Sequence, residues 1–253
     1  MNKTEEDIKN PVEVFIDFEA ITNPFARLMK SKNSTPFCYT LGLKNIKNEF
    51  KTKTYIYNFK TKNVYETLKE HISKDIKQIN NTVKIPNVVF VGHNPTLEKE
   101  LLSIMFPNNV VKALIEEKNL SLSVLTAKDF SDDYFVESRK AIREKAKNNV
   151  VEKVLQKDGS TASYIGFLLW CQTKKVKNPA KFIIDVNPQI LVNELKRYSK
   201  DDVLRMEVLS RDENLKKNIE SIKRKRMLLS LIKNLNLEDS LTVKEIKEKI
   251  WQL

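Results

Sequence analysis

The sequence predicts an α/β fold in which helices cover both faces of a five-stranded mixed sheet, followed by a helical extension. Val12 to Ala20 is almost continuously apolar, which is typical of a central strand buried on both faces. Stretches with helical periodicity then alternate with short apolar runs. Charged helical sequence takes over from about Arg211. We therefore expect one domain over residues 1–210 and a basic helical extension over residues 211–253.

The first three strands are expected to form an antiparallel meander. They are rich in aromatic and β-branched residues and are separated by polar turns. The expected strands are Val12–Ala20, Thr35–Leu43 and Thr52–Phe59.

A helix and a further strand come next, and this crossover places the fourth strand parallel to a neighbour. Pro95 falls in the first turn of the helix that follows this strand. A fifth strand comes after that helix, and nearly everything from Ser131 onward is expected to be helical. The expected elements are a helix over Val64–Asn80, a strand over Val88–Val91, a helix over Pro95–Met105 and a strand over Leu120–Thr126.

The charge of the chain favours polyanionic partners. The sequence has 45 Lys and Arg against 33 Asp and Glu, a formal net charge of +12. Such an excess attracts nucleic acid over long distances because binding releases counterions. The alternative is an ordinary lysine-rich solvated surface, and charge alone does not decide between the two.

Membrane and disulfide-rich classes are not expected. The longest apolar stretch, Ile165–Cys171, falls far short of the roughly 20 residues that cross a bilayer. The two cysteines, Cys38 and Cys171, lie far apart, which argues against a disulfide framework or a cysteine-rich zinc site. We expect a cytoplasmic protein.

Two acids stand in the first expected strand. Asp17 and Glu19 are two residues apart, so both side chains point to one face while Phe18 points to the other. Two acids on an otherwise apolar strand are costly unless a cation meets them, and carboxylate oxygens are the ligands that Mg²⁺ and Mn²⁺ prefer. The alternative is a strand end that emerges into solvent.

A third acid follows the fourth expected strand. If that strand lies parallel to the first, the start of the next helix brings Glu98 towards Asp17 and Glu19. Glu98 could otherwise be a first-turn acid that complements the helix dipole. Farther along, Tyr198 and Asp202 are four residues apart in a predicted helix and so share one face.

These motifs resemble those of the DEDD-type 3′-to-5′ exonucleases of the ribonuclease-H-like superfamily. Asp17-Phe-Glu19 is similar to their first motif, and His93-Asn94-Pro-Thr-Leu-Glu98 to their second. Tyr198 to Asp202 is similar to the third motif of the tyrosine subclass. The histidine subclass does not fit, because Arg197 stands five residues before Asp202. The order of elements also resembles the ribonuclease-H-like architecture.

One residue departs from the pattern. The second-motif acid of these exonucleases is usually Asp after Phe, whereas this chain has Leu97-Glu98. An uncharacterised bacterial family of predicted nucleases in the same superfamily is similar in carrying Glu there.

The resemblance implies two-metal hydrolysis of phosphodiester bonds in DNA or RNA, from a single-stranded 3′ end, releasing nucleoside 5′-monophosphates. Two Mg²⁺ or Mn²⁺ ions would be held by four acids and the attacking water oriented by a tyrosine. Those residues would be Asp17, Glu19, Glu98 and Asp202, with Tyr198. The alternatives are a catalytically degenerate fold that binds nucleic acid or protein, and a structure-specific endonuclease.

Basic stretches and aromatic residues are candidates for contacting nucleic acid. The aromatics also have helical spacing suited to core packing, and the basic stretches could be solvated faces. The candidates are Arg139–Lys147, Lys174–Lys181 and Lys223–Arg226, with Tyr164, Phe167 and Trp170.

Overall fold

The computed structural model describes residues 8–61, 63–117, 120–146, 149–177, 180–234 and 242–251. The chain divides into two compact units, Met1–Val208 and Leu209–Leu253. No helix among these residues combines the length and apolar character needed to span a membrane.

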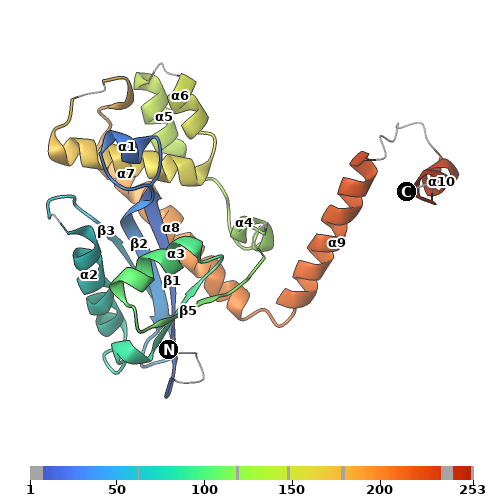
Figure 1. The fold of residues 1–253 in the computed structure, drawn as a ribbon, viewed down its shortest axis with the longest axis horizontal. Helices are drawn as coiled ribbons and strands as arrows, with labels where there is room; N and C mark the ends of the chain where they lie inside the picture. Colours follow the sequence, from blue (N-terminus) through green and yellow to red (C-terminus); the bar gives the residue numbers. More distant parts are fainter. Residues whose placement is uncertain are drawn as a thin grey trace. The chain divides into compact units, whose positions relative to one another are not determined.

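A five-stranded mixed sheet forms the centre of the first unit, as expected (Figure 1). The strand order is β3-β2-β1-β4-β5. Strand β1 pairs antiparallel with β2 and parallel with β4, so the meander and the crossover are both confirmed. The strands are β1 (Val12–Ile21), β2 (Thr35–Lys44), β3 (Phe50–Ile56), β4 (Val88–Gly92) and β5 (Val110–Ala113).

The position expected for the fifth strand is wrong. Strand β5 precedes it, and Leu120–Thr126 instead contains the short helix α4 (Leu122–Leu125). The Ser121 hydroxyl accepts a hydrogen bond from the Val124 N–H at 3.4 Å and so caps a helical turn. Asn109 explains where β5 begins, because its side-chain amide donates to the carbonyls of Ile85 and Val88 at 2.7 and 2.9 Å. These bonds hold the start of β5 beside β4.

The helices follow the expected order, with the short helix α1 between β1 and β2 and the short helix α4 after β5. Ile85–Asn87 and Ala180–Phe182 are 3₁₀ turns. The remaining helices are α1 (Phe25–Leu28), α2 (Val64–Ile79), α3 (Thr96–Met105), α5 (Val136–Lys145), α6 (Asn149–Val154), α7 (Asp158–Lys174), α8 (Pro188–Ser210), α9 (Leu215–Asn234) and α10 (Val243–Trp251).

Helices α2 and α8 cover opposite faces of the sheet. The Tyr39 hydroxyl donates to Asp75 of α2 at 2.7 Å, and the next residue, Thr40, is hydrogen-bonded to Ser199 of α8 at 2.8 Å. Neighbouring residues of a strand point to opposite faces, so the two helices sandwich β2. Strand β2 is almost entirely buried as a result.

Helices α1, α5, α6 and α7 gather beyond the end of the sheet at which β1 finishes (Figure 1). Helix α7 packs against β1, and the Thr22 N–H donates to the Ser163 hydroxyl at 2.8 Å. Tyr164 and Phe167 are buried and stack on Phe25, with centroids 4.8 and 5.1 Å apart. Their role in core packing is therefore confirmed, whereas Trp170 is only half-buried. Of the basic stretches, residues 147, 178 and 179 lie outside the described residues.

The second unit contains helices α9 and α10. Helix α9 exposes apolar side chains at Met227, Leu228, Leu229 and Ile232. Helix α10 begins with a reciprocal cap, in which the Thr242 N–H donates to the Glu245 carboxylate at 2.8 Å and the Glu245 N–H donates to the Thr242 hydroxyl at 3.4 Å.

Candidate metal centre

The first acids of the site are presented by β1. Asp17 is half-buried and Glu19 is 8% exposed, while Phe18 between them is buried on the opposite face. The pairing of β1 with β2 shifts register between Glu19 and Ala20. Such an irregularity changes the direction of the strand where it leaves the central sheet.

Helix α8 carries Tyr198 and Asp202 to the same face of the sheet. The bond between Thr40 and Ser199 anchors the helix one residue from Tyr198. Gly42, also on β2, permits the close approach, because a Cβ there would lie 2.9 Å from Val203 Cγ1.

Glu98 reaches the site because β4 stops early. In the parallel pairing, Val91 lies opposite Phe15, so β4 ends beside the middle of β1 and helix α3 begins next to its last residues. Gly92 makes the tight turn possible, since a Cβ there would lie 2.7 Å from Pro95 Cβ. Glu98 is 8% exposed in the first turn of α3.

Four of the five expected site residues line one pocket, and the fifth, Glu19, lies close to Asp17 and Asp202. One carboxylate oxygen from each of Asp17, Glu19 and Asp202 lies within 4.8 Å of the others. Glu98 is not part of this mutually close set, but it lines the same pocket of about 370 Å³. The pocket is lined by Asp17, His93, Asn94, Glu98, Ser121, Leu122, Ser123, Asp132, Tyr134, Asp158, Tyr198, Asp202 and Arg205.

Burial dominates the electrostatics of the four acids. It raises the pKa of Asp17 well above its ordinary value, and the charges of Asp202, Glu19 and Glu98 raise it further. The pKa of Glu19 is raised for the same reasons. Burial raises the pKa of Glu98 to about 7 against backbone hydrogen bonds that lower it. It raises the pKa of Asp202 to about 7 as well, although Arg205 opposes this increase.

This donor set fits a divalent cation. Carboxylates that share a buried pocket repel one another, and only protons or a cation relieve the repulsion. The ligand atoms are all oxygens, which suits Mg²⁺ or Mn²⁺ better than softer metals. The described residues can therefore bind a metal ion at Asp17, Glu19 and Asp202.

Tyr198 remains a neutral phenol beside these acids. Burial raises its pKa far above the ordinary value near 10, and the charges of Glu19, Asp202 and Asp17 add to the increase. Its ring packs edge-on against Tyr134 with centroids 5.1 Å apart. The side chain is therefore held in place and is available as a hydrogen-bond donor.

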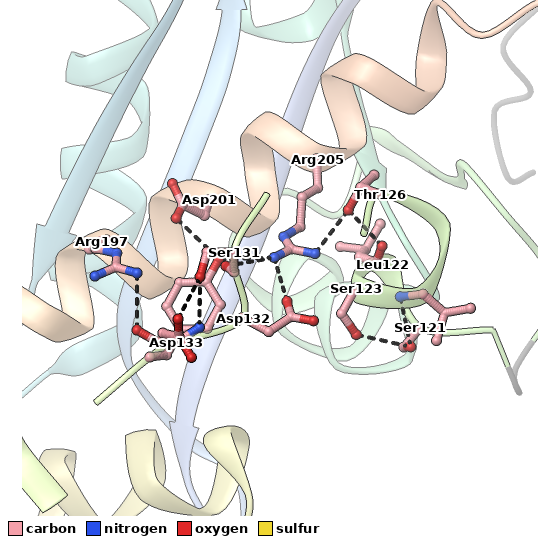
Figure 2. Close-up of polar contacts among 12 residues, drawn as sticks. Ser121, Leu122, Ser123, Thr126, Ser131, Asp132, Asp133, Arg197, Asp201 and Arg205 are labelled. Atoms are coloured by element: carbon pink, nitrogen blue, oxygen red, sulfur yellow. Dashed lines mark hydrogen bonds and ion pairs between the residues drawn. The ribbon is translucent and has the colours of Figure 1, made fainter. Parts of the chain in front are cut away.

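Arg205 is the main site residue that the sequence reasoning missed. It is 1% exposed, one turn after Asp202 on α8, and its guanidinium donates to four groups of the segment before α5 (Figure 2). The acceptors are Thr126 Oγ1 at 2.9 Å, the Ser131 carbonyl oxygen at 3.3 Å, Asp132 Oδ1 at 2.6 Å and Tyr134 Oη at 3.1 Å.

The same face of α8 holds this segment at two further points. Arg197 donates to the Asp133 carbonyl at 3.0 Å, and Asp201 accepts from the Tyr134 hydroxyl at 3.1 Å (Figure 2). Arg197, Asp201 and Arg205 are spaced by four residues, so they form one polar stripe. That spacing indicates a polar stripe from the sequence, but it does not identify the segment that the stripe contacts.

His93 fixes the other side of the pocket. Its Nε2 atom lies 2.6 Å from the Leu120 carbonyl oxygen, which connects the turn after β4 to the residues before α4. Burial lowers its pKa, so the ring is neutral and donates through Nε2. Among the described residues, its buried Nδ1 atom has no hydrogen-bond partner.

Comparison with known proteins adds no assignment: no protein-family model matches the chain, and no curated protein matches its sequence.

Proposed function

We propose that the chain is a metal-dependent phosphodiesterase of the DEDD type, a 3′-to-5′ exonuclease on a ribonuclease-H-like fold that acts on DNA or RNA. The observation that carries the proposal is the mutual closeness of Asp17, Glu19 and Asp202, which come from β1 and α8. Glu98 and Tyr198 on the same pocket support it. The net charge of +12 favours an anionic polymer as substrate.

In the proposed reaction, the acids would bind the cations and Tyr198 would orient the attacking water. Asp17, Glu19 and Asp202 would hold the cations, with Glu98 approaching from α3. When bound, two Mg²⁺ or Mn²⁺ ions would lower the pKa of the attacking water and stabilise the leaving 3′ oxygen. Tyr198, with its raised pKa, would donate a hydrogen bond that orients the water rather than remove its proton.

The charge of the pocket supports an absolute need for cations. Among the described residues that line it are several carboxylates and one guanidinium, that of Arg205. A phosphodiester entering this pocket alone would meet net repulsion from the acids. We therefore expect neither productive binding of the scissile phosphate nor hydrolysis in EDTA.

The test is hydrolysis of a 5′-labelled single strand with Mg²⁺ or Mn²⁺. We expect stepwise shortening by the native chain and a loss of at least about 1,000-fold in Asp17→Asn and Asp202→Asn, since each removes a ligand without changing side-chain shape. Asp129→Asn is the matched control, because Asp129 is exposed and does not line the pocket. Undiminished activity in both site variants, or no hydrolysis of DNA or RNA by the native chain, would refute the proposal. Cleavage of a closed circular strand would instead support an endonuclease.

One observation favours a degenerate, binding-only relative of such enzymes. Glu98 lies outside the set of mutually close carboxylates, whereas a second cation would need a fourth acid. A Mn²⁺ titration followed by thermal unfolding separates the cases. An active centre should gain several degrees in Tm through ligand linkage, and a degenerate one should gain little.

A further inference from the structure

A second pocket of the first unit, of about 390 Å³, lies towards the other end of α7 from the acids. Asp158 starts α7 and lines the acidic pocket, whereas Trp170 lines the second pocket. A helix rises about 1.5 Å per residue, so these two positions are about 18 Å apart. The residues that line this pocket include Lys32, Tyr57, Phe59, Tyr65, Trp170 and Lys174.

The floor of this pocket is rigid and aromatic. Tyr57 and Phe59 are each 5% exposed, with ring centroids 5.1 Å apart in an edge-on arrangement. The Tyr57 hydroxyl donates to the Thr61 carbonyl at 2.5 Å and accepts from the Thr61 hydroxyl at 2.9 Å. Phe59 has a φ of 57°, a left-handed conformation that is unfavourable for a bulky side chain. The surrounding packing holds it there, as at binding sites that retain local strain.

Two further rings leave part of their surface open to the pocket. Trp170 stacks on Phe167, with centroids 6.0 Å apart and planes 26° from parallel, and is half-buried. Tyr65, in the first turn of α2, is also half-buried. Indole and phenol rings with a solvent-accessible face are the surfaces on which nucleobases stack.

The rim of the pocket is positively charged. Lys32 and Lys174 are both exposed, and neither forms an ion pair with any residue that the structure describes. No Asp or Glu is among the described residues that line the pocket. The acidic pocket has the opposite balance, with several carboxylates around Arg205. The second pocket therefore complements a ligand that is both aromatic and anionic.

We propose that this pocket binds single-stranded nucleic acid, with a base stacked on Trp170 and the adjoining phosphates at Lys32 and Lys174. Stacking tolerates any base, and the lysines contact only the backbone, so the binding is independent of sequence. The proposal rests on the proposed function in one respect, namely that the same strand continues to the acidic pocket. Because the two pockets are about 18 Å apart along α7, the second pocket would bind nucleotides of that strand that are remote from the cleaved bond.

The first test is a titration in EDTA, in which hydrolysis is absent. In a Trp251→Phe background Trp170 is the only tryptophan, because the chain has two. We expect a dye-free oligothymidylate to quench its fluorescence saturably. By anisotropy of a labelled oligothymidylate, Trp170→Leu should bind about 5- to 150-fold more weakly, the range for one lost base stack.

The lysines provide variants that leave the core untouched. Lys32→Gln combined with Lys174→Gln should weaken binding. The slope of the logarithm of the binding constant against the logarithm of the salt concentration should become shallower by about one unit per lysine. Lys177→Gln is the matched control, since it removes the same charge from an exposed residue that does not line the pocket. Affinity of the double variant equal to that of the control would overturn the proposal, as would unchanged Trp170 fluorescence when anisotropy shows saturation.

A second readout separates this proposal from the proposed hydrolysis. If the chain cleaves nucleic acid, Trp170→Leu should raise KM for a long strand but leave hydrolysis of a dinucleotide unchanged, because a dinucleotide is too short to reach both pockets. Equal KM values for the long strand in native and Trp170→Leu chains would overturn the proposal that the second pocket binds the strand. If the chain cleaves nothing, the titration in EDTA still decides on binding, so the two failures are distinguishable.

Discussion

Thr40 on β2 and Ser199 on α8 are joined by a buried hydrogen bond of 2.8 Å between their hydroxyl groups. Thr40 lies opposite Asp17 in the strand pairing, and Ser199 lies between Tyr198 and Asp202 along the chain. This one contact therefore links the strand neighbour of one metal-ligand candidate to the helix that carries another. It sets the position of Asp202 relative to the sheet.

Removing one partner of this bond should weaken both folding and metal binding. Ser199→Ala leaves the Thr40 hydroxyl with Thr54 alone, and we expect a loss of about 1–2 kcal/mol in the free energy of unfolding. Looser attachment of α8 should also reduce Mn²⁺ affinity several-fold. Urea unfolding and isothermal titration calorimetry measure the two effects. Equal Mn²⁺ affinity in Ser199→Ala and the native chain would contradict the positioning role.

Gly42→Ala should disturb the same contact between β2 and α8, because the added methyl group would clash with neighbouring side chains. The added Cβ would lie 2.4 Å from the Phe50 ring and 2.9 Å from Val203 Cγ1, so α8 must move away from the sheet or Phe50 must leave its rotamer. We expect a loss of about 1–3 kcal/mol in the free energy of unfolding.

Gly159→Ala is the control for this substitution, because a Cβ there meets no atom within 4 Å. It lies in α7, where Ala is favoured over Gly, so we expect a gain of up to about 1 kcal/mol in the free energy of unfolding. Chemical unfolding of both variants checks the pair. An unchanged free energy of unfolding in Gly42→Ala would show that α8 is not tightly packed on β2.

The order of the elements was predictable because burial on both faces gives β4 an uninterrupted apolar run and β1 an apolar run broken only by acids, and α2 has clear helical periodicity. The meeting of Asp17 and Glu98 at one pocket followed from the parallel pairing of β1 and β4. The position of β5 could not be predicted, because it has only four half-buried residues and depends on the Asn109 side chain.

The environment of Arg205 was equally hidden from sequence reasoning. A buried arginine is uncommon, and nothing local distinguishes it from an exposed one. Its acceptors lie more than 70 residues away in sequence, on the segment between α4 and α5. Such long-range contacts become visible only once the helices are placed in space.

Arg205→Lys should destabilise the fold despite keeping the charge. Lysine cannot reproduce the forked contacts to Thr126, Asp132 and Tyr134, so the buried hydroxyl groups of Thr126 and Tyr134 lose a donor. We expect a loss of about 3 kcal/mol in the free energy of unfolding, measured by urea denaturation. Arg211→Lys, at an exposed position just after the end of α8, provides the comparison. Equal losses in the two variants would contradict the structural role of the guanidinium.

The metal-free protein should lose stability as the pH rises, and Asp202→Asn should remove part of that loss. Burial raises the pKa of Asp202 to about 7 in the folded chain, whereas an unfolded Asp titrates near pH 4. Between these values the folded state binds more protons than the unfolded state, so the free energy of unfolding falls from about pH 4 to about pH 7. An amide cannot ionise and escapes this penalty.

Thermal unfolding in EDTA between pH 4 and pH 9 tests this relationship. Above pH 7 we expect Asp202→Asn to melt a few degrees higher than the native chain, and the two to converge near pH 4. Saturating Mn²⁺ should reverse the order, because only the native chain keeps the full ligand set and gains stability by binding. A native chain as stable as the variant at pH 8 in EDTA would mean that the Asp202 carboxylate is well solvated, which contradicts its burial beside Asp17 and Glu19.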